Sequence, residues 1–521
     1  MNKVNKINTS PKKISVTDLP KKKQLGFMSC IIVVVGACIG AGIFFKNGSI
    51  LSNVHSIVLS IACWLIAAVG VIAMALCLAE IVSGQKQQSN LGIAAWVKTF
   101  NTRFLYNSCK NFIAYIYTPI ILVALAYFFV QAICIGVDWY PPWWGIMLIA
   151  LGILGWFFFT SGLSVRFFNI QNWVIMAVKF IPILFAIVIG YICVGMGNHI
   201  PNPWTDPSKP TDNPTPLFDQ LSVVCGIFAS IPAIFFAFNG FTYPANLTKD
   251  MREPKKLPLT MTIGLILVTV IYVGISVSML ISSGDGAVTG LKEWLTQHHL
   301  AWLYTVIYVL IAIGILSVIN GTVTTSVKIY EDLITGKEII LSRKFTDIQN
   351  RFGERPLSGV LYGFILTFIF FVLCTLIGVF FSNLGGYQGF DTQTAGIFSF
   401  NDIVSNWDVL FIYIFIGIAI LGCLINRKTN KVKVTKSKIF VPAAWISLIL
   451  LGASILYLLV SVFGNIGLVA SYVANHKYDD STKQFDDILS VGLLAIMLFI
   501  YVVITFVPSW ITKRRLARSK A

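Results

Sequence analysis

The chain has 521 residues, of which 56% are hydrophobic and only 12% are charged, and its formal net charge is +17. A soluble globular protein carries about 25% charged residues, so this composition excludes that class and indicates a polytopic membrane protein. The positive charge does not indicate nucleic acid binding, because the basic residues form short, dispersed loops without interleaved aromatic residues.

Apolar segments long enough to cross a bilayer recur along the whole chain, which is typical of transmembrane helices rather than of a transmembrane β-barrel. We therefore predict an all-α polytopic membrane protein with twelve transmembrane helices. Their predicted ranges are 26–48, 53–80, 111–137, 143–162, 167–196, 218–246, 259–283, 301–327, 357–382, 407–426, 439–464 and 487–510.

Basic residues predict the orientation, because the cytoplasmic loops of membrane proteins retain lysine and arginine. With the N-terminus inside, 33 of the 39 basic residues fall on the cytoplasmic side, whereas Lys46 is among the few predicted outside. We expect both termini in the cytoplasm and the protein in the cell (plasma) membrane, with its basic loops near anionic lipid.

The predicted span interiors contain no carboxylate and no histidine, and Glu80 is placed at a cytoplasmic helix end. The ten cysteines are dispersed without a C-x-x-C pair, which argues against disulfides and a metal site. An enzyme needs a base, a nucleophile or metal ligands within reach of one another. The sequence therefore predicts neither an enzyme nor a bound metal or cofactor.

Lys179 is the only charged residue near the middle of a predicted span, 167–196. An ionised group at the bilayer centre is costly unless it faces a cavity or a partner, so such residues usually mark a transport pathway. At 1.5 Å per residue its depth is about 18 Å, beyond the reach of a lysine that snorkels to the interface. A structural hydrogen-bond partner is the alternative interpretation.

Two spans, the first and the sixth, are interrupted near their middles by residues that weaken helices. These residues are Gly36, Gly40 and Gly42 in GACIGAGIF, and Asn239, Gly240, Thr242 and Pro244 in FFAFNGFTYPAN. Close packing through small residues would explain the first cluster alone, but two breaks five spans apart indicate inverted repeats around a midplane site. Freed N–H groups bind a carboxylate and freed C=O groups an ammonium, so we predict a site for a zwitterion.

Five stretches resemble the amino acid–polyamine–organocation (APC) superfamily of transporters with the LeuT-type fold. They are IGAGIFF in the first span, ALCLAEI at the end of the second, AVKFIPILFAIVIG in the fifth, FAFNGFTYPANLTKDMREPKKLP after the sixth and SVINGTVTTSVKIYEDLITGKE in the eighth. The resemblance implies a 5+5 inverted repeat with broken helices 1 and 6. The repeats would cover 26–196 and 218–426, followed by two C-terminal helices at 439–510, with basic cytoplasmic tails at 1–25 and 511–521.

The resemblance also implies which residues bind the substrate, mostly through their backbone. These are Cys38, Ile39, Gly40, Ala41 and Gly42 at the first break and Phe236, Ala237, Phe238, Asn239 and Gly240 at the second. An aromatic gate is expected at Phe236 or Phe238. Lys179 matches a fifth-helix lysine that takes the place of a coupling sodium ion in some proton-coupled members. The facing residues of the eighth helix would be Asn320, Thr324 and Thr325.

The sequence therefore predicts a secondary active amino acid transporter that works by alternating access, coupled to protons or exchanging one amino acid for another. A pocket without a buried carboxylate disfavours a substrate with a cationic side chain, which leaves neutral or polar amino acids. An amino acid sensor or a solute channel built on the same fold is the alternative. The sequence does not predict which amino acid is bound, nor the oligomeric state.

Overall fold

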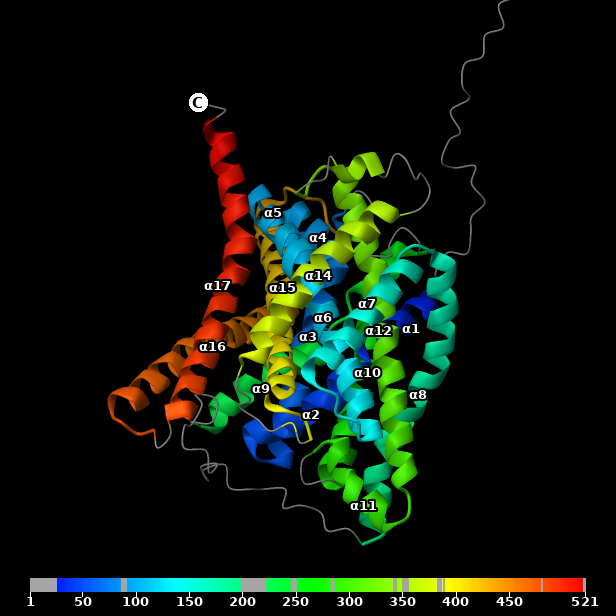
Figure 1. The fold of residues 1–521 in the computed structure, drawn as a ribbon. Helices are drawn as coiled ribbons and strands as arrows, with labels where there is room; N and C mark the ends of the chain where they lie inside the picture. The colour runs from blue at the N-terminus through cyan, green and yellow to red at the C-terminus, as the bar shows by residue number, and fades with distance from the viewer. Residues whose placement is uncertain are drawn as a thin grey trace, which may run out of the picture.

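The computed structural model describes residues 26–85, 91–197, 222–244, 251–282, 286–340, 344–348, 356–381, 387, 389–478 and 481–518. The predicted tail 1–25 and the last three residues of the predicted tail 511–521 lie outside this part of the chain. Most of the described residues belong to helices (Figure 1). The chain is therefore an all-α protein, as predicted.

The helices follow one another along the chain in the order shown in Figure 1. They are α1 (Phe27–Cys38), α2 (Ala41–Val54), α3 (Ile57–Ser83), α4 (Ile93–Phe100), α5 (Arg103–Phe112), the π-helical turn η2 (Ile113–Tyr117), α6 (Thr118–Val137), α7 (Trp143–Thr160), α8 (Val165–Gly195), α9 (Val223–Phe238), the 3₁₀ turn η5 (Pro254–Lys256), α10 (Leu257–Ser282), the 3₁₀ turn η6 (Val288–Leu291), α11 (Lys292–Gln297), α12 (Ala301–Thr335), α14 (Leu357–Val379), α15 (Thr392–Thr429), α16 (Phe440–Ala474) and α17 (Ser481–Arg518).

Within the described residues, ten helical segments are long and apolar enough to cross a membrane. The pair α1 and α2, bent by 47° at its break, makes an eleventh, and α9 is a shorter apolar helix in the region of the predicted sixth span. The protein is therefore a multi-pass membrane protein. The number twelve and the inverted repeat stay predictions.

The tenth predicted span, 407–426, is too short at its N-terminal side, because α15 begins at Thr392. Its first half carries polar residues that are buried inside the bundle, including Asn401 and Ser405, and these lowered the hydropathy of the sequence there. Asp402 and Asp408 consequently lie inside a membrane helix. The prediction that the span interiors contain no carboxylate is therefore wrong, and Lys179 is not the only deeply placed charge.

Lys46, predicted on the outer side, lies in α2, which continues to Val54, and its side chain is completely buried. Its side of the membrane stays a prediction. Glu80 lies near the end of α3 as predicted, yet it too is fully buried. Charged residues thus reach further into the helix bundle than hydropathy indicated, and each of these two has a partner of opposite charge.

The interior of the bundle is formed by helices that pack on several neighbours. α12 packs against α6 and α8, α10 packs against α3 and α8, and α2 packs against α9. Figure 1 shows α16 and α17 on one side of this bundle, opposite α8 and α10. α16 and α17 expose large apolar side chains such as Trp445, Phe463 and Phe499, as expected of helices that face lipid.

Candidate functional site

The first helix break separates α1 from α2. α1 ends at Cys38, Ile39 is extended, and α2 begins after Gly40. Gly42 lies in the first turn of α2, and its lack of a side chain allows this turn to approach α9 closely. A Cβ atom on Gly42 would lie 2.5 Å from the Cα of Ala237, so a side chain there would push α2 away from α9.

The second break ends α9 at Phe238, where Asn239 turns into an extended conformation. Gly240 follows with a φ of +102°, in the region that favours glycine. A Cβ atom on Gly240 would also lie 2.8 Å from the Ala37 carbonyl oxygen. The two breaks are in direct contact, since the Cys38 thiol donates to the Phe238 carbonyl over 3.4 Å.

Tyr272 of α10 joins the carbonyl ends of both broken helices. Its hydroxyl donates to the Cys38 carbonyl at 2.7 Å and to the Ala237 carbonyl at 2.8 Å. Its ring packs against Phe238 and Trp64, with centroids 5.3 and 5.4 Å apart. One buried hydroxyl therefore holds the ends of α1 and α9 together. No sequence pattern indicates this role, because Tyr272 lies in a continuous apolar run.

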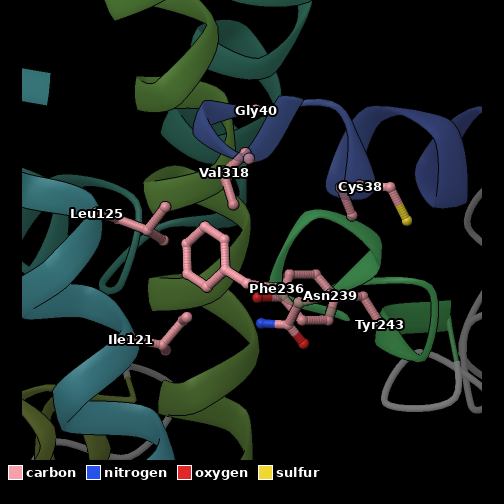
Figure 2. Close-up of a pocket in the computed structure, with 10 residues that line it drawn as sticks. Cys38, Gly40, Ile121, Leu125, Phe236, Asn239, Tyr243 and Val318 are labelled. Carbon is pink, nitrogen blue, oxygen red and sulfur yellow. The ribbon is translucent and has the colours of Figure 1, made fainter. Parts of the chain in front are cut away.

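A cavity lies between the two breaks and helices α6 and α12 (Figure 2). Its lining residues are Ala37, Cys38, Gly40, Gly42, Ile121, Leu125, Phe236, Asn239, Tyr243 and Val318. Figure 2 shows the Phe236 ring pointing between Ile121 and Leu125 on one side and Val318 on the other. The cavity has a volume of about 20 Å³, which is room for a water molecule and too small for an amino acid.

Five of the ten residues expected to bind substrate line this cavity. They are Cys38, Gly40, Gly42, Phe236 and Asn239. Ile39, Ala41, Ala237 and Gly240 belong to the two breaks without lining the cavity as it stands. Phe238 instead packs against Trp64 and Tyr272. Of the two expected gate residues, Phe236 is therefore the one that occupies the cavity.

Lys46 lies over the Phe236 ring, and its side chain is completely buried. Its Nζ atom lies 4.5 Å from the centroid of the Phe236 ring and 5.1 Å from that of Phe128. It also forms an ion pair with Asp402 of α15. The ion pair links α2 to α15 directly beside the cavity.

Lys179 of α8 points into the bundle, with 3% of its surface exposed. Its Nζ atom donates to the Gly36 carbonyl at 2.5 Å. Gly36 lies in the last turn of α1, where carbonyls lose their intrahelical partners. The aliphatic part of Lys179 lies beside Gly314 of α12. A Cβ atom added to Gly314 would lie 3.7 Å from the Cγ atom of Lys179. Lys179 therefore bridges three helices and does not face lipid.

The expected partners of Lys179 on α12 have other contacts. The Asn320 amide donates to the Phe168 carbonyl at 3.3 Å, and the hydroxyls of Thr324 and Thr325 bond to carbonyls of their own helix. None of their described hydrogen bonds involves Lys179. The residue of α12 that lines the cavity is instead Val318, which sequence reasoning did not select.

A polar network meets the cavity at Asn239. The hydroxyl of Tyr117, on the π-helical turn η2, donates to Asn239 Oδ1 at 2.8 Å. The hydroxyls of Tyr243 and Thr322 lie 2.8 Å apart and share a hydrogen bond. These side chains give the otherwise apolar pocket its polar wall. Among the described residues no group of three or more His, Cys, Asp or Glu side chains could hold a metal ion.

Comparison with known proteins identifies relatives over most of the chain. It is 32% identical to an uncharacterized protein of Mycoplasma pneumoniae over 94% of both chains. It is 24% identical to the serine/threonine exchanger SteT of Bacillus subtilis, over 79% of this chain and 84% of the exchanger. It is 27% identical to the human b(0,+)-type amino acid transporter 1, over 49% of this chain and 51% of that transporter.

Two solved structures share the fold at low sequence identity. A manganese transporter of Eremococcus coleocola matches with a TM-score of 0.51 and 15% identity, over 94% of this chain and 95% of that chain. MhsT in complex with L-phenylalanine matches with a TM-score of 0.51 and 14% identity, over 83% and 98%. The amino acid permease family model matches residues 25–475. The protein therefore belongs to the amino acid permease family of the APC superfamily, carries the fold of LeuT-type transporters, and transports amino acids rather than catalysing a reaction.

Proposed function

We propose that the protein is a secondary active transporter of neutral or polar amino acids in the cell membrane, with both termini in the cytoplasm. It works by alternating access around the cavity between the two helix breaks. The observation that carries this proposal is the direct contact of the breaks, whose carbonyl ends share the Tyr272 hydroxyl. The relative named as a serine/threonine exchanger supports a small, uncharged substrate.

The breaks supply binding groups for both ends of a zwitterion. Unpaired N–H groups at the start of α2 favour a carboxylate, because the N-terminus of a helix carries partial positive charge. Carbonyls at the ends of α1 and α9 favour an ammonium. The substrate side chain would then meet Ile121, Leu125 and Val318. No carboxylate lines the cavity within the described part of the chain, so a cationic side chain would lack a counter-charge.

Phe236 serves as the gate in this proposal. The cavity is too small for an amino acid while the ring lies between α6 and α12, so the ring has to move before substrate binds. Lys46 holds the ring by a cation–π contact and is itself held by Asp402. Opening the gate thus requires α2 and α15 to separate locally.

Lys179 serves as a fixed or protonation-dependent cation between α8 and α1. Its ammonium takes the place that a bound metal cation would have against the freed Gly36 carbonyl. In a proton-coupled carrier its charge would follow the transport cycle, and in an exchanger it would lock the site. An inward proton gradient that drives accumulation would indicate the first mechanism, and a requirement for amino acid inside the vesicle would indicate the second.

A thermal-shift screen against the twenty amino acids tests the proposed substrate class. A ligand at 100 times its Kd stabilises a protein by about 2.7 kcal/mol, so a true substrate raises the melting temperature measurably. We expect small neutral or polar amino acids to do so, and arginine and lysine not to. The stabilising amino acid is then tested for counterflow in proteoliposomes.

The outcomes of these two assays separate the alternatives. Stabilisation followed by counterflow supports a transporter. Stabilisation without counterflow would instead indicate a sensor. Flux that does not saturate with substrate would indicate a channel. If no amino acid stabilises the protein and none shows counterflow, the proposed function is wrong.

A further inference from the structure

Asp408 lies near the middle of α15 and is completely buried. Neither of its carboxylate oxygens has a hydrogen-bond partner among the described residues. The other buried acids in the described part of the chain have partners, since Glu80 pairs with Arg427 and Asp487 accepts a hydrogen bond from the Tyr478 hydroxyl. The partly exposed Asp402, on the same helix as Asp408, pairs with Lys46. An ionised carboxylate without a partner is strongly disfavoured in a membrane protein interior. Asp408 in this conformation is therefore the neutral acid, which means that it carries a proton.

The groups within electrostatic range of Asp408 include no counter-charge. Four different elements supply them: Tyr117 comes from η2, Tyr243 from the turn after α9, Cys374 from α14 and Tyr501 from α17. All four are uncharged side chains at neutral pH.

The hydroxyls around Asp408 already have other hydrogen-bond acceptors or partners. Tyr501 donates to the Val404 carbonyl at 3.1 Å, Tyr117 donates to Asn239, and Tyr243 is bonded to Thr322. None of these hydrogen bonds goes to the acid.

Charged side chains on the other elements near α15 are paired elsewhere. Lys46 of α2 is bound to Asp402, Lys110 of α5 to Glu338, and Glu80 of α3 to Arg427. Lys98 of α4 lies over the ring of Tyr106. Arg103, at the start of α5, is exposed. Within the described part of the chain no cation binds either carboxylate oxygen of Asp408, so a proton is the species that neutralises it.

A single side chain connects Asp408 to the substrate cavity. Tyr117 lies within electrostatic range of Asp408 and donates its hydroxyl to Asn239, which lines the cavity. Tyr117 lies on the π-helical turn η2, which interrupts the otherwise continuous helix from Arg103 to Val137. Such turns occur frequently at functional sites. The Tyr117 hydroxyl thus binds the broken end of α9 from a position where the charge of Asp408 acts on it.

We propose that Asp408 is the proton-binding site of the transport cycle. A proton from water on one side of the membrane forms an O–H bond with a carboxylate oxygen, and that bond breaks to release the proton to water on the other side. When Asp408 loses its proton, the carboxylate attracts the Tyr117 hydroxyl, which then leaves Asn239. The state of the acid is thereby transmitted to the second helix break. This inference rests on the proposed function and leaves Lys179 as a fixed cation.

The test measures proton movement and amino acid movement separately in the same vesicles. The full chain is reconstituted into liposomes that contain a pH-sensitive dye, and the amino acid with the largest thermal shift is added outside. We expect uptake by the unaltered protein to acidify the lumen. Asp408→Asn imitates the protonated acid, so we expect it to lose this acidification while counterflow, which needs no net proton movement, continues.

Asp391→Asn is the matched control. It makes the same chemical change at the exposed N-cap of the same helix, where asparagine is equally suitable. We expect this variant to keep both acidification and counterflow.

Two results would overturn the inference without affecting the proposed function. In the first, the unaltered protein shows counterflow, but its uptake of the amino acid does not acidify the lumen. This result requires no variant. The other is acidification by Asp408→Asn at the unaltered ratio of protons to amino acid. Absence of counterflow in the unaltered protein would instead reject the proposed function itself.

Discussion

Removing the Tyr272 hydroxyl should separate the two broken helices. Tyr272→Phe keeps the ring and its packing against Trp64 and Phe238 but deletes the donor that serves the Cys38 and Ala237 carbonyls. Each buried hydrogen bond contributes about 1 kcal/mol, and a buried polar group left unpaired costs about 1–3 kcal/mol. The hydroxyl carries one proton, which the two carbonyls share, so we expect a loss of about 1–3 kcal/mol in the free energy of unfolding.

Tyr127→Phe is the matched control for this change. Its hydroxyl is also buried in the bundle, yet it bonds to the Thr375 hydroxyl, which itself donates to the Phe371 carbonyl at 2.7 Å. Its loss therefore leaves no helix end without a donor. We expect this control to cost about 1 kcal/mol.

Two measurements check the prediction. Thermal unfolding in detergent, with and without the stabilising amino acid, reports stability and binding, and counterflow in liposomes reports transport. We expect Tyr272→Phe to lose stabilisation by the amino acid and to lose counterflow, because the backbone carbonyls of Cys38 and Ala237 at the helix ends are no longer held in place. If Tyr272→Phe has the same melting temperature as Tyr127→Phe and still shows counterflow, then the Tyr272 hydroxyl does not organise the site.

Three further substitutions test other parts of the site. Gly42→Val should abolish counterflow in liposomes, because the valine side chain would meet the backbone of α9. Gly452→Val is the control: Gly452 has open space around it, so this variant should keep counterflow. Phe236→Ala should lower the free energy of unfolding by about 3–5 kcal/mol. It should also enlarge the cavity, so that larger neutral amino acids raise the melting temperature of the variant but not that of the unaltered protein in a thermal-shift assay. Lys179→Met should remove the hydrogen bond from the Lys179 ammonium to the Gly36 carbonyl, worth about 1.5–3 kcal/mol, and stop transport. Unchanged amino acid uptake with unchanged pH dependence would contradict the proposed role of Lys179 as a cation at the site.

The sequence was most informative about the breaks in the helices. Gly40 and Asn239 stand out in long apolar runs because a membrane helix rarely contains them without a reason. The structure has Gly40 as the N-cap of α2 and Asn239 as the C-cap of α9. Lys179 was recognisable for a similar reason, since its depth in the span could be counted along the chain. Local features of composition thus predicted where the two helices break.

The sequence was least informative about contacts between distant residues. Lys46 pairs with Asp402, 356 residues further along the chain, and nothing near either residue predicts that partner. Hydropathy makes the tenth predicted span shorter than α15, because it cannot distinguish a polar residue facing water from one facing a buried partner. Tyr117 and Tyr272 were overlooked because an aromatic residue in an apolar segment looks like ordinary core.

The ion pairs of α15 suggest how the cavity is kept closed. Near its first half, Asp402 holds Lys46 of α2, and at its other end Arg427 binds Glu80 of α3 through two hydrogen bonds of 2.9 and 2.6 Å. Breaking either buried pair leaves an uncompensated charge, which costs about 3–5 kcal/mol. Opening both ends at once would therefore cost about twice as much as opening one.

Asp408 lies between these two ion pairs on the same helix. Its protonation adds a charge change at the centre of α15, where neither pair can compensate it. If Asp408 binds the transported proton as proposed, α15 is held by an ion pair on either side of the titrating group and would favour opening one side at a time. On that proposal we expect α15 to be the element whose position the substrate and the proton determine together.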